Sequence, residues 1–213
     1  MRLYLSSYRL GNDTESLKKL VGKPRAKVAV TINAVDFSTD HERVANGLQD
    51  EMNDMRSLGF EPEHIDLRDY FNDTDRLLEK LSQFDAVWIK GGNVFILRKA
   101  MHLSGFDQVI EKLIKTNKLV YTGYSAAVCV LGPTLDGAEL VDDVNAVAKG
   151  YNYETIWDAY GLIDWYPIVH YQSDHEESEL VEKELEYVRS KGTKYKTLRD
   201  GEALSLMAMK SGL

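Results

Sequence analysis

Two strand-length apolar runs, each followed at once by a turn and then by a helical pattern, constrain this sequence most. The first is Ala86–Lys90 (AVWIK), which leads into Gly91-Gly92-Asn93, and the second is Lys118–Gly123 (KLVYTG), which stops at Tyr124-Ser125. Continuous apolar strands that run directly into helices are typical of parallel sheets covered on both faces. The sequence therefore predicts an α/β fold with the second strand at the sheet centre.

The rest of the chain continues the same alternation. A helix is expected over residues 40–58, where Val44, Leu48, Met52 and Met55 recur at helical spacing. Further strands are expected at 2–7, 27–31, 63–67, 194–198 and 203–207, and further helices at 73–81, 95–101, 106–115 and 177–189. Residues 133–165 are irregular and are expected to form loops over one end of the sheet. Because no repeat or linker divides the chain, residues 1–213 are expected to form one domain.

Charge and cysteine content argue against several classes of partner. The chain carries 26 Lys and Arg against 34 Asp and Glu, a net charge of −8, which opposes attraction to nucleic acid and to anionic membranes. No segment approaches the ~20 apolar residues that cross a bilayer, and the N-terminal stretch lacks a secretory apolar core. The single cysteine, Cys129, permits neither an internal disulfide nor a multi-cysteine metal site. A reducing, cytoplasmic location is the simplest expectation.

Ser125 has the sequence setting of a nucleophilic serine. In Gly123-Tyr124-Ser125-Ala126-Ala127 small residues stand two before and two after the serine, which permits a tight strand-to-helix turn that exposes its hydroxyl. The same turn presents the next amide, that of Ala126, to an oxyanion. A serine that only caps the following helix explains these five residues equally well.

The second glycine turn is expected to meet the first. Ligand sites in parallel sheets form outside the carboxyl ends of the strands, so two strand-to-helix turns can share one crevice. Gly92 is the candidate for a second oxyanion donor, and Gly91, Asn93 and Tyr124 are candidates for contacting the substrate. An ordinary tight turn with no functional role is the alternative for the glycine pair.

The segments IKGGNVFILRKAM and YTGYSAAVCVLGPTL resemble the two signature turns of the peptidase E family of serine peptidases. The spacing of the turns, the chain length and the later HY and RDGEA segments are also similar, so the resemblance covers nearly the whole chain. It implies a three-layer α/β sandwich with a central, mostly parallel sheet, akin to class I glutamine amidotransferases and flavodoxin-like proteins. It also implies a Ser-His-acid triad and a homodimer. No metal or other cofactor is expected, because the sequence has no metal-ligand spacing, Walker loop or dinucleotide fingerprint.

His170 is the candidate base among the five histidines. A nucleophilic serine needs a neutral imidazole within hydrogen-bond reach. The short apolar stretch Tyr166–Val169 is expected to deliver His170 at the end of a strand, and this segment resembles the catalytic-histidine strand of the family. His175 stands among acidic residues at the start of a helix, where a solvated surface position explains it.

Asp200 and Asp143 compete for the role of the triad acid. Asp200 is the first choice, since it ends an expected strand and matches the acidic residue in the late turn of the family, although Asp-Gly is also an ordinary hairpin turn. Asp143 follows Asp142 in the segment LVDDVN, where the family also has a functionally important aspartate.

Two departures from the family affect what can be transferred to this chain. The elbow of the family reads Ser-Ala-Gly, whereas Ala127 occupies the third position here. The segment after His170, QSDHEESELVEKELE, is acidic where the aspartyl dipeptidases carry arginine, and a substrate carboxylate needs a paired cation. A neutral or basic N-terminal residue is therefore expected in place of aspartate.

These observations predict a serine-type peptidase that hydrolyses short peptides, as a dipeptidase or N-terminal exopeptidase, through an acyl-enzyme. The alternative is a non-catalytic homologue that binds a small molecule or partner in the same crevice. An amidotransferase-like enzyme that uses Cys129 is less well supported, because Cys129 falls one turn into the elbow helix, where a buried, small apolar side chain is expected.

Overall fold

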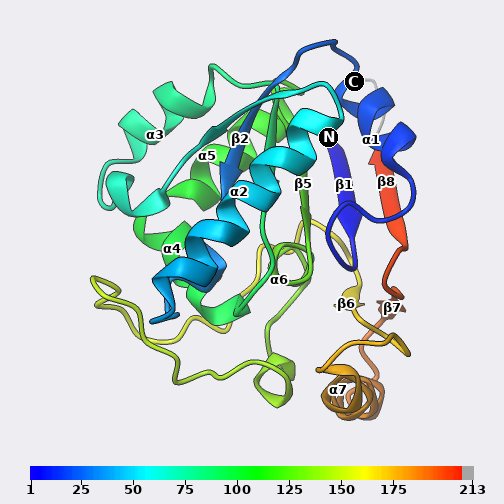
Figure 1. Ribbon diagram of the computed structural model, residues 1–213. Coiled ribbons are helices and arrows are strands. Elements are labelled where there is room, and N and C mark those ends of the chain that lie inside the picture. Colours follow the sequence, from blue (N-terminus) through cyan, green and yellow to red (C-terminus); the bar gives the residue numbers. More distant parts are fainter. Residues whose placement is uncertain (208–213) are drawn as a thin grey trace, which may run out of the picture.

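The computed structural model describes residues 1–207 and is built around a six-stranded sheet (Figure 1). Its strands are β1 (Arg2–Ser6), β2 (Lys27–Thr31), β3 (Glu61–His64), β4 (Ala86–Ile89), β5 (Val120–Tyr124) and β8 (Ala203–Met207). Their order across the sheet is β3-β2-β4-β5-β1-β8. The first five are parallel, and β8 pairs antiparallel with β1. The predicted central, mostly parallel sheet is confirmed, with β4 and β5 in its middle.

Helices cover both faces of this sheet. On one face lie α1 (Thr14–Val21) and α2 (His41–Ser57). On the other lie α3 (Thr74–Leu81), α4 (Val94–Leu103), α5 (Phe106–Lys115) and the short α6 (Ala126–Cys129). Four of these helices begin at a side chain that accepts a backbone N–H of the first turn, namely Asp13, Asp40, Asp73 and Asn93. No helix within residues 1–207 is long and apolar enough to cross a membrane.

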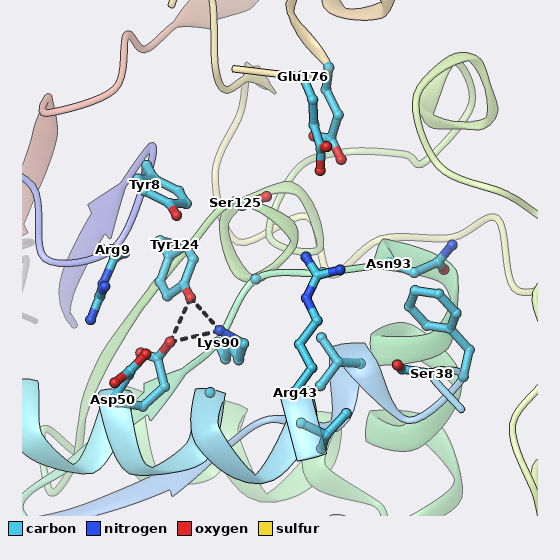
Figure 2. Close-up of a pocket in the computed structure, with 18 of the residues that line it drawn as sticks. Tyr8, Arg9, Ser38, Arg43, Asp50, Lys90, Asn93, Tyr124, Ser125 and Glu176 are labelled. Carbon is cyan, nitrogen blue, oxygen red and sulfur yellow. Dashed lines mark hydrogen bonds and ion pairs between the residues drawn. The ribbon is translucent and has the colours of Figure 1, made fainter. Parts of the chain in front are cut away.

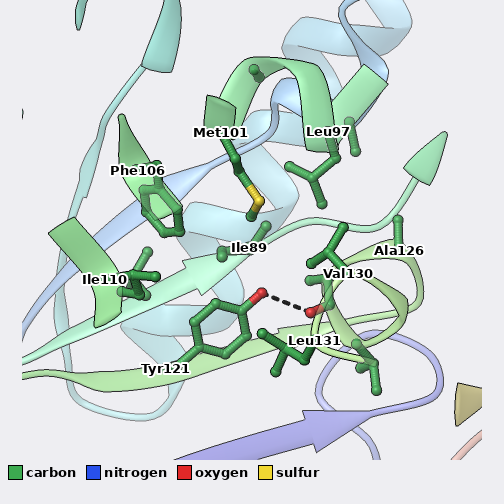
Figure 3. Packing of buried hydrophobic residues seen from close by; sticks show 14 of the residues in the cluster. Ile89, Leu97, Met101, Phe106, Ile110, Tyr121, Ala126, Val130 and Leu131 are labelled. Atoms are coloured by element: carbon green, nitrogen blue, oxygen red, sulfur yellow. Dashed lines mark hydrogen bonds between the residues drawn. The ribbon is translucent and has the colours of Figure 1, made fainter. Parts of the chain in front are cut away.

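The core between the sheet and α4, α5 and α6 fixes where α6 begins (Figure 3). Ile89 and Tyr121 of the two central strands pack in one cluster with Leu97 of α4 and Ile110 of α5, and all four are fully buried. The Tyr121 hydroxyl donates a hydrogen bond of 2.7 Å to the carbonyl of Ala127. Since this bond joins β5 to the first turn of α6, the junction between them is held from inside the core.

A smaller unit lies beside the main sheet. Strands β6 (Tyr166–Ile168) and β7 (Tyr195–Thr197) form a separate parallel pair, and α7 (Ser178–Ser190) packs against β6. Residues 133–165 contain only the short 3₁₀ helix η3 (Ala138–Leu140), in agreement with the irregular segment that the sequence predicts. The strand predicted at residues 194–198 therefore forms, but outside the main sheet.

Two elements differ from the sequence-based expectation. The sequence predicts a strand over 63–67, whereas β3 lies at Glu61–His64 and a 3₁₀ helix, η2, follows at Leu67–Tyr70. The reason is that β3 is an edge strand whose residues are mostly exposed, so it needs no apolar run. Helix α1 is not predicted, because its eight residues offer too short a periodic pattern.

Leu97 should contribute strongly to stability. Leu97→Ala removes a fully buried side chain and leaves a cavity, so the free energy of unfolding should fall by about 2–5 kcal/mol. Leu140→Ala is the matched control, because Leu140 is 37% exposed and its truncation should cost about 1 kcal/mol or less. Urea unfolding followed by circular dichroism measures both changes, and equal losses in the two variants would contradict this description of the core.

Candidate active site

The carboxyl ends of β4 and β5 bring the two turns into direct contact. A Cβ atom added at Gly91 would lie 2.7 Å from the Cβ of Ser125 and 3.0 Å from the ring of Tyr124, so only glycine fits between the turns. Gly92 has a φ of 146°, and a Cβ there would lie 2.8 Å from the carbonyl oxygen of Ala34. Such a backbone conformation is open to glycine and rarely to other residues. The two turns therefore form the walls of one crevice.

Ser125 occupies a strained backbone conformation at the junction of β5 and α6. Its φ of 52° and ψ of −118° lie outside the regions that side-chain-bearing residues normally adopt, and such strain is concentrated at functional sites. The Ser125 side chain does not cap α6, so the capping role does not describe it. A Cβ at Gly123 would lie 2.8 Å from the Cβ of Ala127. Glycine at position 123 thus leaves room for the methyl group that departs from the family pattern.

The elbow opens into a pocket of about 930 Å³ (Figure 2). Tyr8, which follows β1, lies over the pocket and makes edge contacts with the rings of Tyr124, His170 and His175. Arg43 rises from α2 into the space between Ser125, Asn93 and Glu176 (Figure 2). The pocket is therefore lined by α2, by the turns after β4 and β5, and by the loop before α7.

His170 and Asp200 are paired beside this pocket. His170 comes two residues after β6 and is 2% exposed, and its Nδ1 lies 2.7 Å from Oδ1 of Asp200. Asp200 lies in the turn between β7 and β8, where its backbone N–H donates to the hydroxyl of Ser173 at 2.8 Å. Because Asp200 engages Nδ1, Nε2 is the ring nitrogen of His170 that is left for Ser125.

The surroundings of His170 favour its neutral form. Burial lowers the pKa of His170, and the neighbouring His175 lowers it further, while Asp200 acts in the opposite direction. A neutral imidazole at pH 7 is the form that can accept a proton from a serine. The electrostatics of the site thus suit a general base.

Ser7 joins His170 and Asp200, although no sequence pattern singles it out. This fully buried residue directly follows β1. Its hydroxyl donates a hydrogen bond of 2.9 Å to Oδ1 of Asp200 and accepts one of 2.8 Å from the backbone N–H of His170. The carbonyl of Leu198 competes for the same hydroxyl proton at 3.2 Å. The one available signal is the position of Ser7 at the carboxyl end of a strand that neighbours β5.

The competing acids, Asp143 and Asp142, are engaged elsewhere. The carboxylate of Asp143 accepts the N–H of Asn145 at 2.9 Å. Asp142 accepts the N–H of Val94 at 2.8 Å, at the start of α4, and burial raises the pKa of its carboxyl to about 7. Both line the pocket, but within residues 1–207 the carboxylate bonded to the His170 ring is that of Asp200.

The amides of Gly92 and Ala126 remain available at the crevice. Neither donates a hydrogen bond in the part of the chain that the structure describes, and free amides at such a turn are suited to stabilising an oxyanion. Asn93 has a structural task instead, since its Oδ1 caps the N–H of Ile96 and its Nδ2 donates to the carbonyl of Asp143, both at 2.9 Å. Asn93 therefore ties the glycine turn to the loop that carries Asp143.

A buried carboxylate lies beneath the pocket and binds the residue directly before each turn. Glu51 of α2 is 1% exposed and accepts hydrogen bonds from Tyr124 at 2.7 Å and from Lys90 at 2.9 Å. The indole N–H of Trp88 donates to its second oxygen at 2.7 Å. Burial, and then Glu51, raise the pKa of Tyr124, so its hydroxyl keeps its proton and stays a donor. Tyr124 thus belongs to the pocket floor.

Cys129 lies in α6 and packs against the main core. Burial raises the pKa of its thiol, which keeps it in the thiol form at neutral pH, whereas the thiolate is the nucleophilic form. Cys129 therefore has the surroundings of a packing residue.

Comparison with known sequences gives the family. A model of peptidase family S51 matches residues 10–210. An uncharacterized peptidase of Listeria monocytogenes serovar 1/2a is 25% identical over 143 residues, which are 67% of this chain and 66% of that protein. An uncharacterized peptidase of Pasteurella multocida is 26% identical over 95 residues, 45% of this chain and 44% of that protein. The matches thus span just under two thirds of the first relative and less than half of the second.

Solved structures share the fold. A crystal structure of a Listeria monocytogenes EGD-e protein, provisionally described as peptidase E, has a TM-score of 0.76 at 22% identity and covers 96% of this chain and 93% of that one. A crystal structure of a peptidase from an acI-B1 Actinobacterium has a TM-score of 0.65 at 15% identity, and the match covers 96% of this chain and 82% of that one. Likeness at this level of identity establishes the three-layer α/β fold. Because the family model extends over nearly the whole sequence, the chain belongs to peptidase family S51.

Proposed function

We propose that this peptidase hydrolyses short peptides with Ser125 as nucleophile, His170 as base and Asp200 as the acid. The strained elbow of Ser125 carries the proposal, because it opens into a pocket that is also lined by the buried His170, whose Nδ1 is paired with Asp200. A nucleophile, a base and a carboxylate that orients the base are the three parts that this chemistry needs.

The mechanism follows from these positions. His170 takes the hydroxyl proton as Ser125 attacks the peptide carbonyl, and the amides of Ala126 and Gly92 stabilise the oxyanion. Collapse of this intermediate breaks the C–N bond, and His170 returns the proton to the leaving amine. His170 then activates a water that hydrolyses the acyl-enzyme, while Asp200 keeps the imidazole in its productive tautomer.

In the described residues the Ser125 hydroxyl makes no hydrogen bond, either to His170 or to any other group. Catalytic hydrogen bonds are often long or badly aligned in free enzymes and tighten when substrate binds. The proposed mechanism therefore includes approach of Ser125 and His170 on substrate binding.

The charges of the pocket support a substrate with a free N-terminus. Two of its cations are already neutralised, since Lys90 pairs with Glu51 and Arg9 pairs with Asp54, each at 2.9 Å. Eight of the residues that line the pocket carry a carboxyl group, including Asp142, Asp143, Glu176 and Glu177 on its rim. Such a rim attracts an ammonium group and repels a carboxylate side chain. We therefore infer a preference for a neutral or basic N-terminal residue.

Arg43 is the cation that remains for a substrate carboxylate. Within residues 1–207 its guanidinium takes part in no ion pair, and it points into the pocket (Figure 2). A short peptide is a zwitterion, with an ammonium group at one end and a carboxylate at the other. An arginine in a pocket with an acidic rim can therefore fix the direction in which such a peptide binds. Recognition of the substrate C-terminus by Arg43 favours a dipeptidase over an enzyme that acts on long chains.

Ser125→Ala and His170→Ala should each abolish covalent labelling by a fluorophosphonate probe, because the probe reacts with a serine that a base has activated. Mass spectrometry should locate the adduct on Ser125 of the wild type. Peptide hydrolysis should fall by at least about a thousandfold in both variants. His102→Ala, which changes a histidine on α4, is the matched control and should label normally. If the folded wild type is not labelled, the triad is wrong and a crevice that only binds its ligand becomes the better description.

Ser7→Ala should reduce kcat by about tenfold or more, since a hydrogen bond to a charged group contributes about 1.5–3 kcal/mol. Loss of the Ser7 hydroxyl leaves more negative charge on Asp200, which raises the pKa of His170. The acid limb of the kcat/KM profile should therefore move to higher pH. Ser6→Ala is the control, because among residues 1–207 the Ser6 hydroxyl donates only to the carbonyls of Tyr8 and Glu202. An unchanged pH profile in Ser7→Ala would reduce Ser7 to a purely structural residue.

Arg43→Ala should raise KM for dipeptides by about tenfold with little change in kcat. The same dipeptides with an amidated C-terminus should be hydrolysed equally by wild type and variant, because they lack the carboxylate that Arg43 binds. Arg9→Ala is the matched control, since Arg9 is paired with Asp54. Its loss should affect dipeptides with a free and with an amidated C-terminus to the same extent. If Arg43→Ala raises KM equally for the free and the amidated dipeptides, Arg43 does not bind the substrate C-terminus.

A further inference from the structure

A cluster of potential metal ligands lies at the catalytic histidine itself. His170, His175 and Glu177 each offer one ligand atom, and these three atoms lie within 4.8 Å of one another. The rings of His170 and His175 are stacked, with centroids 3.8 Å apart and planes inclined by 10°. His175 and Glu177 belong to the loop before α7, which closes one side of the pocket.

Hydrogen bonds limit which nitrogen of His170 can bind a metal and what a metal at His175 must displace. Because Nδ1 of His170 is bonded to Asp200, its Nε2 is the nitrogen that can bind a metal. Nδ1 of His175 accepts the N–H of Glu177 at a long 3.3 Å and lies 3.8 Å from Oε2 of the same residue. The lone pair of this nitrogen accepts the Glu177 amide in the structure, and a metal ion bound there would replace this long hydrogen bond.

The chemistry of this donor set suits zinc. Two imidazoles and one carboxylate, with a fourth position open to solvent, form a common set of ligands for Zn²⁺. Asp200 supplies the outer carboxylate that typically fixes and strengthens a metal-binding histidine. The surrounding carboxylates of Asp142, Asp143 and Glu176 add a field that attracts a divalent cation.

The required movement falls on side chains that are partly exposed. Zinc–nitrogen bonds of about 2.0 Å require donor atoms to lie about 3.3 Å apart, so the cluster must contract and the stacked rings must tilt out of parallel. The side chains of His175 and Glu177 are 18% and 32% exposed, so they can turn toward His170, which is fixed at 2% exposure.

We propose that His170, His175 and Glu177 form a site for a divalent transition-metal ion such as Zn²⁺, and that the bound ion inhibits the peptidase reversibly. Coordination occupies the Nε2 lone pair of His170, the pair that would accept the proton of Ser125. The inhibition rests on the proposed role of His170 as base, whereas binding of the metal does not.

Metal binding is tested first, by measurements that do not depend on peptidase activity. The metal-free full chain is titrated with Co²⁺, whose visible absorption reports tetrahedral coordination, and with Zn²⁺ by isothermal titration calorimetry. One ion should bind per chain, and His175→Ala should weaken binding at least about a hundredfold. His102→Ala is the matched control, because His102 lies 3.7 Å from the carboxylate of Asp107, much as His175 lies beside Glu177. Equal affinity in the wild type and His175→Ala would overturn the site.

Inhibition is tested by labelling of Ser125 with the fluorophosphonate probe. Zn²⁺ should slow labelling of the wild type, a chelator should restore it, and His175→Ala should keep labelling in the presence of Zn²⁺. If Zn²⁺ binds through His175 but Ser125 is never labelled, the metal site stands and the proposed triad fails. If Ser125 is labelled but Zn²⁺ slows the wild type and His175→Ala equally, the triad stands and inhibition through this site is refuted.

Discussion

The carboxylate of Glu51 fixes the starting points of both turns that form the site. Tyr124 and Lys90, the residues directly before the two turns, converge on this one side chain from neighbouring strands. A buried carboxylate is costly unless hydrogen bonds and an opposite charge compensate it, and here three donors do so. Gly91 and Ser125 lie so close together that neither turn can shift toward the other. Their contact therefore depends on the positions that Glu51 gives to the two turns.

The second half of the site is held in a different way. His170 and Asp200 come from the small β6–β7 unit and its exit toward β8, and the hydroxyl of Ser7, directly after β1, binds both of them. One half of the site is thus fixed by a charged cluster under the sheet, and the other by hydrogen bonds at its edge. The proposed metal site belongs to the second half, where the loop before α7 supplies two partly exposed side chains.

The parts of the fold that follow from the sequence are those encoded locally. The alternation of strands and helices, the elbow at Ser125 and the glycine turn are contiguous patterns, so each is visible without knowledge of the rest of the chain. Ser7 is not visible, because its partner Asp200 lies 193 positions away. The stacking of His170 on His175 depends on an irregular loop that has no periodic pattern. A homodimer, a cytoplasmic location and the absence of a cofactor stay predictions.

The pairing of β8 with β1 has a consequence for when the proposed site can form during synthesis. The last strand described lies beside the first one, and Asp200 directly precedes it. A nascent chain that has emerged only as far as α6 already contains the serine elbow but neither the histidine nor its acid. During synthesis, the proposed hydrolytic site can therefore be completed only after the chain as far as Asp200 has been made.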